Sequence, residues 1–227
     1  MPEREFVHFP KILRAEKVTC FITEKIDGTN AQVVVDHDAY NALYVMAGSR
    51  NRWIQPEPAT ADNFGFARWV QGNAEMLKRL GPGTHYGEWY GQGIGRGYGM
   101  TERRWALFDR RMWSPEELTV RELDTIGVEC VPILATCSIA NLASTMAHLD
   151  VQLGTVGSAL VHGWRQPEGY VVSVGDIRFK VTDNGNKSKW LAAAQDGLDR
   201  RLNAVDEVGA AAAIADCGPE NVMLGDW

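Results

Sequence analysis

Apolar and polar residues alternate along several short stretches of the chain, and this period of two predicts β-strands. In chain order, the strands are expected over residues 19–25, 31–35, 43–47, 85–90 and 105–108. Two further runs, 170–174 and 177–181, flank Gly175-Asp176, a pair typical of tight hairpin turns. The first two strands are expected to be joined through a turn at Asp27-Gly28-Thr29-Asn30.

Helical spacing of apolar residues occurs between these strands and after them. One such run stops at Gly81-Pro82-Gly83, and another helix begins at Ser114 with a capping box. The expected helices cover 64–80, a short segment after Ser114, 138–149 and the alanine-rich tail. The pattern predicts an α+β fold, with an antiparallel-sheet domain over residues 1–185 and a short helical C-terminal extension over 186–227.

The composition narrows the class of protein further. Apolar residues make up 45% of the chain, and 23 basic against 29 acidic residues give a net charge of −6. This acidic balance argues against a general electrostatic binder of nucleic acids, but it leaves a local basic groove open. Apolar runs fall short of the roughly 18 residues of a membrane helix, and the first residues lack a signal-peptide pattern. The cysteines form no C-x-x-C pair, so we expect reduced thiols in a cytoplasmic protein without membrane contact.

The stretch Glu24-Lys25-Ile26-Asp27-Gly28-Thr29-Asn30 places a lysine at the end of an apolar strand, before a turn with a carboxylate and an amide. A lysine amine is a nucleophile only when it is neutral, and its ordinary pKa of about 10.4 leaves few neutral molecules at neutral pH. Burial and neighbouring cations lower the pKa of such an amine and activate it. The alternative is an ordinary lysine at a strand end, with its amine in solvent.

Basic and glycine-rich loops follow this lysine. Arg50 and Arg52 lie in a loop after a strand, either to bind phosphate or ribose oxygens or as plain surface arginines. In the run 85–99 glycine alternates with aromatic residues, which permits close backbone approach and base stacking, or forms a flexible loop. Glu88 lies within this run. The sequence has neither a G-x-G-x-x-G fingerprint nor a G-x-x-x-x-G-K-[ST] phosphate loop.

Arg178 and Lys180 are two residues apart in a predicted strand, so their side chains point to one face. Two cations on one face of a buried strand are unfavourable unless an anion meets them, whereas an exposed strand would simply be solvated there. Trp105 lies in an earlier strand, where it could equally serve as plain packing.

Taken in order, these stretches resemble the motifs of the covalent nucleotidyltransferases, which are the polynucleotide ligases and mRNA capping enzymes. The matching elements are K-x-D-G at Lys25, an arginine motif at Arg50, G-E at Gly87-Glu88, an aromatic strand at Trp105, E-G-x-V at Glu168 and a basic pair at Arg178 and Lys180. The residues around Lys25 are most similar to the RNA ligase branch, with its phage nick-sealing and kinetoplastid RNA-editing ligases. The resemblance covers roughly residues 20 to 185 and implies an ATP-grasp-like ligase adenylylation domain.

The resemblance also implies a stepwise reaction. Lys25 attacks the α-phosphate of ATP, the AMP of the resulting lysyl-AMP passes to an RNA 5′-phosphate, and an RNA 3′-hydroxyl then seals the strands. Asp27, Glu88 and Glu168 would hold waters around Mg²⁺ or Mn²⁺, with Trp105 and Val171 on the two faces of adenine. The residues expected to contact the nucleotide are Glu24, Lys25, Asn30, Arg50, Glu88, Trp105, Glu168, Val171, Arg178 and Lys180, the last two at the phosphates.

The chain departs from these families in ways that affect the substrate. Arg178 stands where relatives commonly have a lysine, and the tail reads as helical where DNA ligases and capping enzymes carry an oligonucleotide-binding barrel. We expect RNA with 3′-hydroxyl and 5′-phosphate ends, nicked or held together, bound weakly or with the help of an end-presenting protein. The arginines expected to bind it are Arg50, Arg52, Arg96, Arg103, Arg104, Arg110 and Arg111.

Two other functions remain open from the sequence. A minimal DNA ligase or a GTP-using capping enzyme would share the motifs, but the helical tail disfavours both. A catalytically silent nucleotide- or RNA-binding module would keep the fold without becoming adenylylated, and the presence of every motif residue argues against it.

Overall fold

The computed structural model describes residue 8 and residues 12–182, which form two β-sheets with short helices around them. The strands are β1 (Thr19–Lys25), β2 (Thr29–His37), β3 (Leu43–Ser49), β4 (Gly83–Gly91), β5 (Arg103–Leu107), β6 (Val128–Cys130), β7 (Ile133–Ser138), β8 (Gly169–Val174) and β9 (Ile177–Thr182). The α-helices are α1 (Phe66–Gly72), α2 (Ala74–Leu77), α3 (Pro115–Val120) and α4 (Leu142–Thr155). Short 3₁₀ helices cover Ala15–Lys17, Ala59–Ala61, Asn63–Gly65, Lys78–Leu80, Gly97–Gly99, Asp124–Ile126 and Ile139–Asn141.

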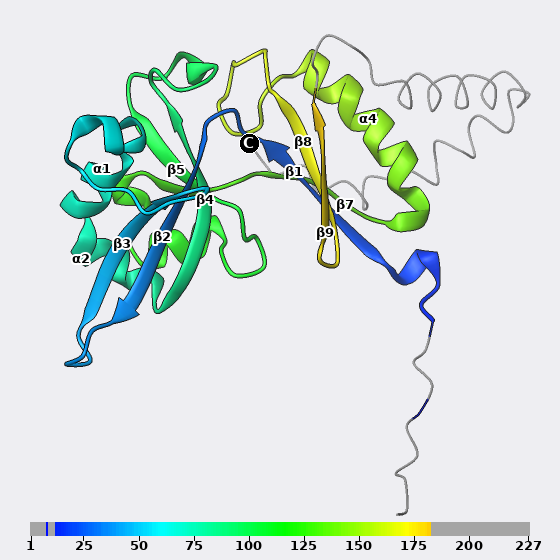
Figure 1. The fold of residues 1–227 in the computed structure, drawn as a ribbon. Helices are drawn as coiled ribbons and strands as arrows, with labels where there is room; N and C mark the ends of the chain where they lie inside the picture. The colour runs from blue at the N-terminus through cyan, green and yellow to red at the C-terminus, as the bar shows by residue number, and fades with distance from the viewer. Residues whose placement is uncertain (1–7, 9–11, 183–227) are drawn as a thin grey trace, which may run out of the picture.

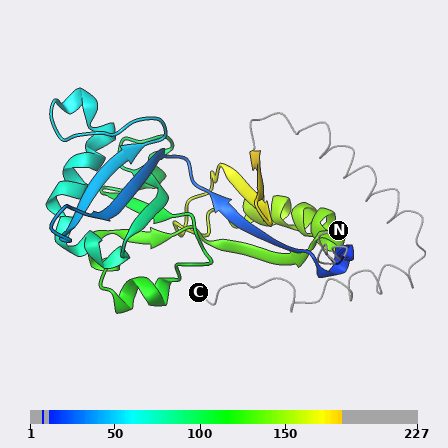
Figure 2. The ribbon, with the colours of Figure 1, turned by 60° about the horizontal axis from the view of Figure 1, so that its bottom comes forward.

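The two sheets form separate lobes. One sheet has the strand order β7-β1-β8-β9 and the other the order β3-β2-β4-β5-β6. Neighbouring strands are antiparallel except β5 and β6, which run parallel. Helices α1 and α2 lie on the five-stranded lobe and α4 on the four-stranded lobe (Figures 1 and 2). The predicted α+β class is therefore confirmed, with two sheets where the strand pattern predicts one core.

Most predicted strands form near their expected bounds, because alternation marks a strand with one buried face. The strand predicted over 19–25 matches β1 residue for residue, and β8 and β9 form the predicted hairpin. The helix predicted after Ser114 is α3, and the Ser114 hydroxyl accepts a hydrogen bond from the Glu117 amide at 3.2 Å. The strands β6 and β7 are not predicted from the alternation of apolar and polar residues.

The predicted helices need correction. The helix expected over 64–80 is interrupted at Asn73, whose side-chain amide donates to the Trp69 carbonyl at 2.8 Å. The helix expected over 138–149 has the wrong start, because Ser138 pairs with Thr19 as the last residue of β7 and α4 begins four residues later. The predicted helical extension over 186–227 lies outside the described residues.

The predicted hairpin between the first two strands does not form. β1 belongs to the four-stranded sheet and β2 to the five-stranded sheet, so residues 26–28 cross from one lobe to the other. Ile26 is 3% exposed and packs between the lobes with Tyr90 and Val131. A Cβ on Gly28 would lie 2.4 Å from the Trp89 carbonyl oxygen. The crossing therefore requires a glycine at this position, because a side chain would collide with the backbone of β4.

Each lobe has its own hydrophobic core. In the five-stranded lobe, Phe66 and Trp69 of α1 meet Trp89 and Trp105 of the sheet, with ring centroids 5.2 to 6.1 Å apart. In the other lobe, α4 packs against the four-stranded sheet. No helix within the described part of the chain has the length and apolar character needed to cross a membrane.

Candidate active site

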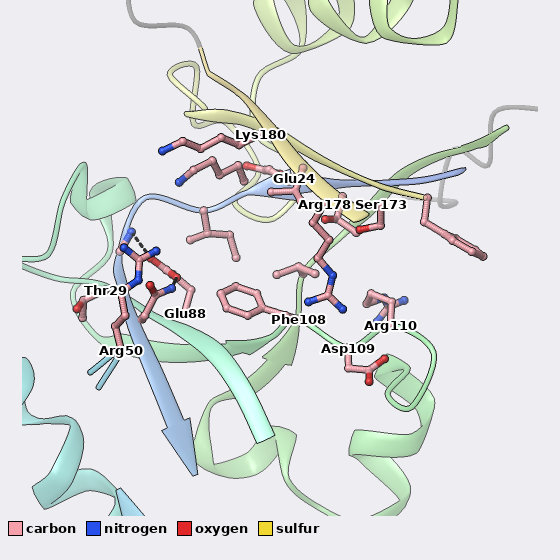
Figure 3. Close-up of a pocket in the computed structure, with 18 of the residues that line it drawn as sticks. Glu24, Thr29, Arg50, Glu88, Phe108, Asp109, Arg110, Ser173, Arg178 and Lys180 are labelled. Carbon is pink, nitrogen blue, oxygen red and sulfur yellow. Dashed lines mark hydrogen bonds between the residues drawn. The ribbon is translucent and has the colours of Figure 1, made fainter. Parts of the chain in front are cut away.

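A cavity of about 820 Å³ lies between the two sheets, within the ~300–1,000 Å³ range typical of ligand pockets. Its lining comes from β1, β2, β4, β8 and β9 and from the loops after β3 and β5 (Figure 3). The predicted site residues that line it are Glu24, Lys25, Asn30, Arg50, Glu88, Val171, Arg178 and Lys180. Asp27, Trp105 and Glu168 do not line it.

One face of the four-stranded sheet forms a wall of this cavity. On β1 the lining side chains include Thr23 and Lys25, on alternate positions of the strand. Val171 of β8 pairs with Thr23 on one side and with Lys180 of β9 on the other. Arg178 stands one alternate position farther along β9, on the same face as Lys180, as predicted. Of the two alternatives that the sequence leaves open, the structure has the exposed strand, because β9 is the edge strand and both cations are exposed.

Lys25 forms an ion pair inside the molecule. Its Nζ donates a hydrogen bond to Glu168 Oε2 at 2.6 Å, and the two side chains are 21% and 18% exposed. Glu168 comes directly before β8, whose first residue, Gly169, pairs with Lys25. Backbone pairing thus brings the two side chains together. The contact joins the end of β1 to the segment that leads into β8.

Glu88 is a buried carboxyl group opposite Asn30 in the β2–β4 ladder. Its Oε1 accepts a hydrogen bond from the Gly28 amide at 3.2 Å, and its Oε2 accepts one from Asn30 Nδ2 at 3.0 Å. Burial raises the pKa of Glu88 to about 7, although the positive charge of Lys25 acts in the opposite direction. The Glu88 carboxyl group therefore changes its charge near neutral pH, and it does so next to Gly28, in the segment that crosses between the lobes.

The carboxylate of Glu24 is held by hydrogen bonds to the loop that precedes β8. Glu24 is 1% exposed, and its oxygens accept hydrogen bonds from the Ser158 hydroxyl at 2.6 Å and from the amides of Ala159 and Leu160 at 2.7 and 3.0 Å. Neighbouring residues of a strand point to opposite faces, so Lys25 in the cavity wall sends Glu24 to the other side. Its oxygens therefore anchor the loop that leads to β8, and the predicted contact of Glu24 with the nucleotide stays a prediction.

The aromatic residues that line the cavity are Phe21 and Phe108, and the predicted Trp105 is not among them. Trp105 is fully buried in the core of the five-stranded lobe, where its indole Nε1 donates to the Ala31 carbonyl at 3.3 Å. Trp105 pairs with Trp89, whereas Ala106 pairs with Glu88, so the alternate positions of β5 face the cavity. The predicted position of Trp105 against adenine is therefore wrong. The alternation of the strand could have indicated Phe108.

The predicted RNA-binding arginines divide into two sets. Arg50, Arg52, Arg110 and Arg111 line the cavity. The other three, Arg96, Arg103 and Arg104, bind the protein itself: Arg96 pairs with Asp27, Arg103 donates to the Phe64 carbonyl, and Arg104 pairs with Glu129. These three do not line the cavity, and they tie the backbone together.

The carboxylates near Lys25 do not form a ready-made metal site. Within residues 12–182 no group of three or more His, Cys, Asp or Glu side chains is arranged to hold a metal ion directly. Asp27 pairs with Arg96 at 3.3 Å, Glu168 pairs with Lys25, and Glu88 binds the Gly28 amide. Their oxygens are the donors that Mg²⁺ and Mn²⁺ prefer, so contact through water is the form that this arrangement accommodates.

Comparison with known proteins identifies the family. The family model described as RNA ligase matches residues 18–191, more than half of the chain. The chain belongs to the RNA ligase family. No curated protein gives a significant match to it.

Solved structures of similar fold include variants of an RNA ligase. Two point variants of the RNA ligase of Naegleria gruberi, both solved with ATP and Mn, match with TM-scores of 0.53 and 0.54 at 22% and 20% identity. The matches cover 80% and 75% of this chain but 53% and 51% of the Naegleria chains. An apo form of another variant matches with a TM-score of 0.51 at 24% identity. This chain thus spans about half the length of the RNA ligase structures it resembles.

The raised pKa of Glu88 makes the stability of this RNA ligase family member depend on pH. The folded carboxyl keeps its proton up to about pH 7, whereas the unfolded one releases it near 4.5. Between these values the folded state binds more protons, so the free energy of unfolding falls as pH rises. We expect Glu88→Gln to become more stable relative to wild type between about pH 5 and about pH 8, by at most ~3 kcal/mol.

Denaturant unfolding at the two pH values measures this difference. Glu75→Gln is the control, because the Glu75 side chain is 85% exposed. A stability difference between wild type and Glu88→Gln that stays the same at both pH values would contradict the assignment.

Proposed function

We propose that this chain is an ATP-dependent RNA ligase that joins RNA 3′-hydroxyl and 5′-phosphate ends through AMP bound covalently to Lys25. The observation that carries the proposal is the position of Lys25, at the crossing between the lobes and in the wall of the cavity. Membership of the RNA ligase family supports it, as does the fold shared with the Naegleria enzyme, whose variants were solved with ATP and Mn.

The chemistry is a series of displacements at phosphorus. The neutral Nζ of Lys25 attacks the α-phosphate of ATP, the bond to the β-phosphate breaks, and pyrophosphate leaves. An RNA 5′-phosphate oxygen then attacks the lysyl-AMP phosphorus and releases Lys25. Finally the RNA 3′-hydroxyl attacks the activated 5′-phosphate, and AMP leaves as the strands join. Pyrophosphate in the first step and AMP in the last leave as anions, so cationic groups around the cavity stabilise the departing charge, whereas the second step releases the lysine amine.

The cavity has side chains for each part of the nucleotide. We place the base between Phe108 and Val171 and the ribose near Arg50 and Glu88 (Figure 3). Lys180 lies level with the Thr23–Val171 pair, near enough to Lys25 to contact the α-phosphate. Figure 3 shows Arg178 pointing toward Phe108, so it meets the nucleotide farther from Lys25.

A divalent cation fits the donor set around Lys25. The carboxylates of Asp27, Glu88 and Glu168 are hard oxygen donors, and we propose that they hold Mg²⁺ or Mn²⁺ through waters. Such an ion supplies positive charge at the triphosphate. In holding the ion, Glu168 would exchange its contact with Lys25 for one with a metal-bound water.

We propose a nick, or ends already held together, as the RNA substrate. Arg50, Arg52, Arg110 and Arg111 provide a short basic rim, whereas the whole chain carries a net charge of −6. Binding through so few phosphate contacts is weak and sensitive to salt, so an end-presenting protein would strengthen it. The buried free thiols, Cys20, Cys130 and Cys137, agree with RNA repair in the reducing cytoplasm.

Replacing Lys25 should separate the first step from the last. Lys25→Ala removes the nucleophile, so we expect no ATP-dependent sealing of a nicked RNA. The variant should still join a strand whose 5′ end already carries AMP, because that step uses the RNA hydroxyl. Gel assays with both substrates measure this, with Lys17→Ala, an exposed lysine outside the cavity, as control. ATP-dependent sealing by Lys25→Ala would contradict the proposal.

The two aromatic residues of β5 and its following loop should have different effects. Phe108→Ala should raise the apparent Kd of ATP roughly 10-fold, since base stacking on an aromatic ring is worth ~1–3 kcal/mol. Trp105→Ala should instead lower the free energy of unfolding by about 3–5 kcal/mol, as expected for a large core side chain. Nucleotide titration and denaturant unfolding of both variants test this. The reverse pattern would return adenine to Trp105.

A further inference from the structure

The glycine loop, residues 91–99, does not open into the cavity as a base-stacking platform. It lies against the crossing between the lobes, where a Cβ on Gly95 would come within 2.6 Å of the Asp27 carbonyl oxygen. The hydroxyl oxygen of Tyr98 accepts a hydrogen bond from the Asp27 amide at 2.8 Å, and Tyr98 is 2% exposed. The loop thus packs on the backbone of the nucleophile motif.

Arg96 of this loop joins two segments that are far apart in the sequence. Its Nε lies 3.3 Å from Asp27 Oδ2, and its Nη1 donates to the Gln166 carbonyl at 3.1 Å. Asp27 is two residues after Lys25, and Gln166 is two residues before Glu168, the partner of Lys25. The Arg96 guanidinium therefore connects the segment that follows Lys25 with the segment that precedes Glu168.

This connection begins where the sheet ends. The β1–β8 pairing stops at Lys25 and Gly169, and beyond this point the two segments of the chain are no longer paired. Arg96 bridges them beyond that point, and Tyr98 supports the same bridge, since its ring centroid lies 5.6 Å from that of Trp164. A planar guanidinium suits this position, because its fixed fork of donors can bond a carboxylate and a carbonyl together.

We propose that Arg96 is a positioning residue for the adenylylation of Lys25. It fixes Asp27 and the segment of Glu168 on the two sides of the amine, and so holds the amine in line for attack. Arg96 does not line the cavity, so it acts through these residues without touching the nucleotide. The inference rests on the proposed function, and it assigns the glycine loop to the first chemical step.

Three variants test the assignment. Arg96→Gln removes the charge and the fork, whereas Arg96→Lys keeps a charge that can pair with Asp27 but cannot also bond Gln166 in the same way. Arg79→Gln is the matched control. Like Arg96, Arg79 pairs with a carboxylate, Glu122, donates to a backbone carbonyl and lies outside the cavity lining, but its partners do not belong to the segments around Lys25 and Glu168.

The first readout is the single-turnover rate of AMP attachment as a function of ATP concentration. We expect Arg96→Gln to lower the maximal rate ~10- to 100-fold, since a small misplacement of reacting groups costs about that much. The ATP concentration at half-maximal rate should change less than about 3-fold, because no nucleotide contact is lost. Arg96→Lys should recover part of the rate, and Arg79→Gln should match wild type.

The second readout is amide hydrogen exchange without nucleotide, which does not depend on the chemistry. Arg96→Gln should speed exchange in the segments 26–28 and 164–168, relative to Arg79→Gln. An unchanged rate of AMP attachment, or a melting temperature that falls with no difference between Lys and Gln at position 96, would overturn the positioning role. If wild type takes up no AMP, the proposed function fails, and unchanged exchange would then overturn the Arg96 assignment separately.

Discussion

The crossing of the chain between its two sheets is the constraint on which the rest of the site depends. β1 ends at Lys25 and β2 begins at Thr29, so three residues carry the chain from one lobe to the other. Gly28 passes so close to β4 that no side chain fits, and Ile26 is buried between the lobes. The end of β1 is thereby fixed against both sheets, and Lys25 stands in the wall of the cavity between them.

The carboxylates around this crossing are each paired with a cation or with hydrogen-bond donors. Every carboxylate near Lys25 has its own partner: Glu168 pairs with Lys25, Asp27 with Arg96, and Glu88 accepts from backbone and amide donors. Unpaired charges in so buried a place would be unfavourable. The pairs of Lys25 with Glu168 and of Asp27 with Arg96 therefore lie on either side of the crossing and hold its charged groups in one network.

The sequence predicts local structure and residue order well, and spatial partners poorly. Alternation places β1, β8 and β9, and it puts Arg178 and Lys180 on one face. It does not tell which strands pair, so the sequence suggests a hairpin at a crossing between sheets. The predicted contact of Trp105 with adenine is wrong for the same reason, because only the pairing with β4 shows which side of β5 meets the cavity.

If Lys25 accepts AMP, the intact mass of the protein will show it. Protein freed of bound AMP is incubated with ATP and Mg²⁺, and the mass of wild type is compared with that of Lys25→Ala. We expect one added AMP on wild type and none on the variant. A folded wild type that gains no AMP, or a variant that gains one, would contradict it.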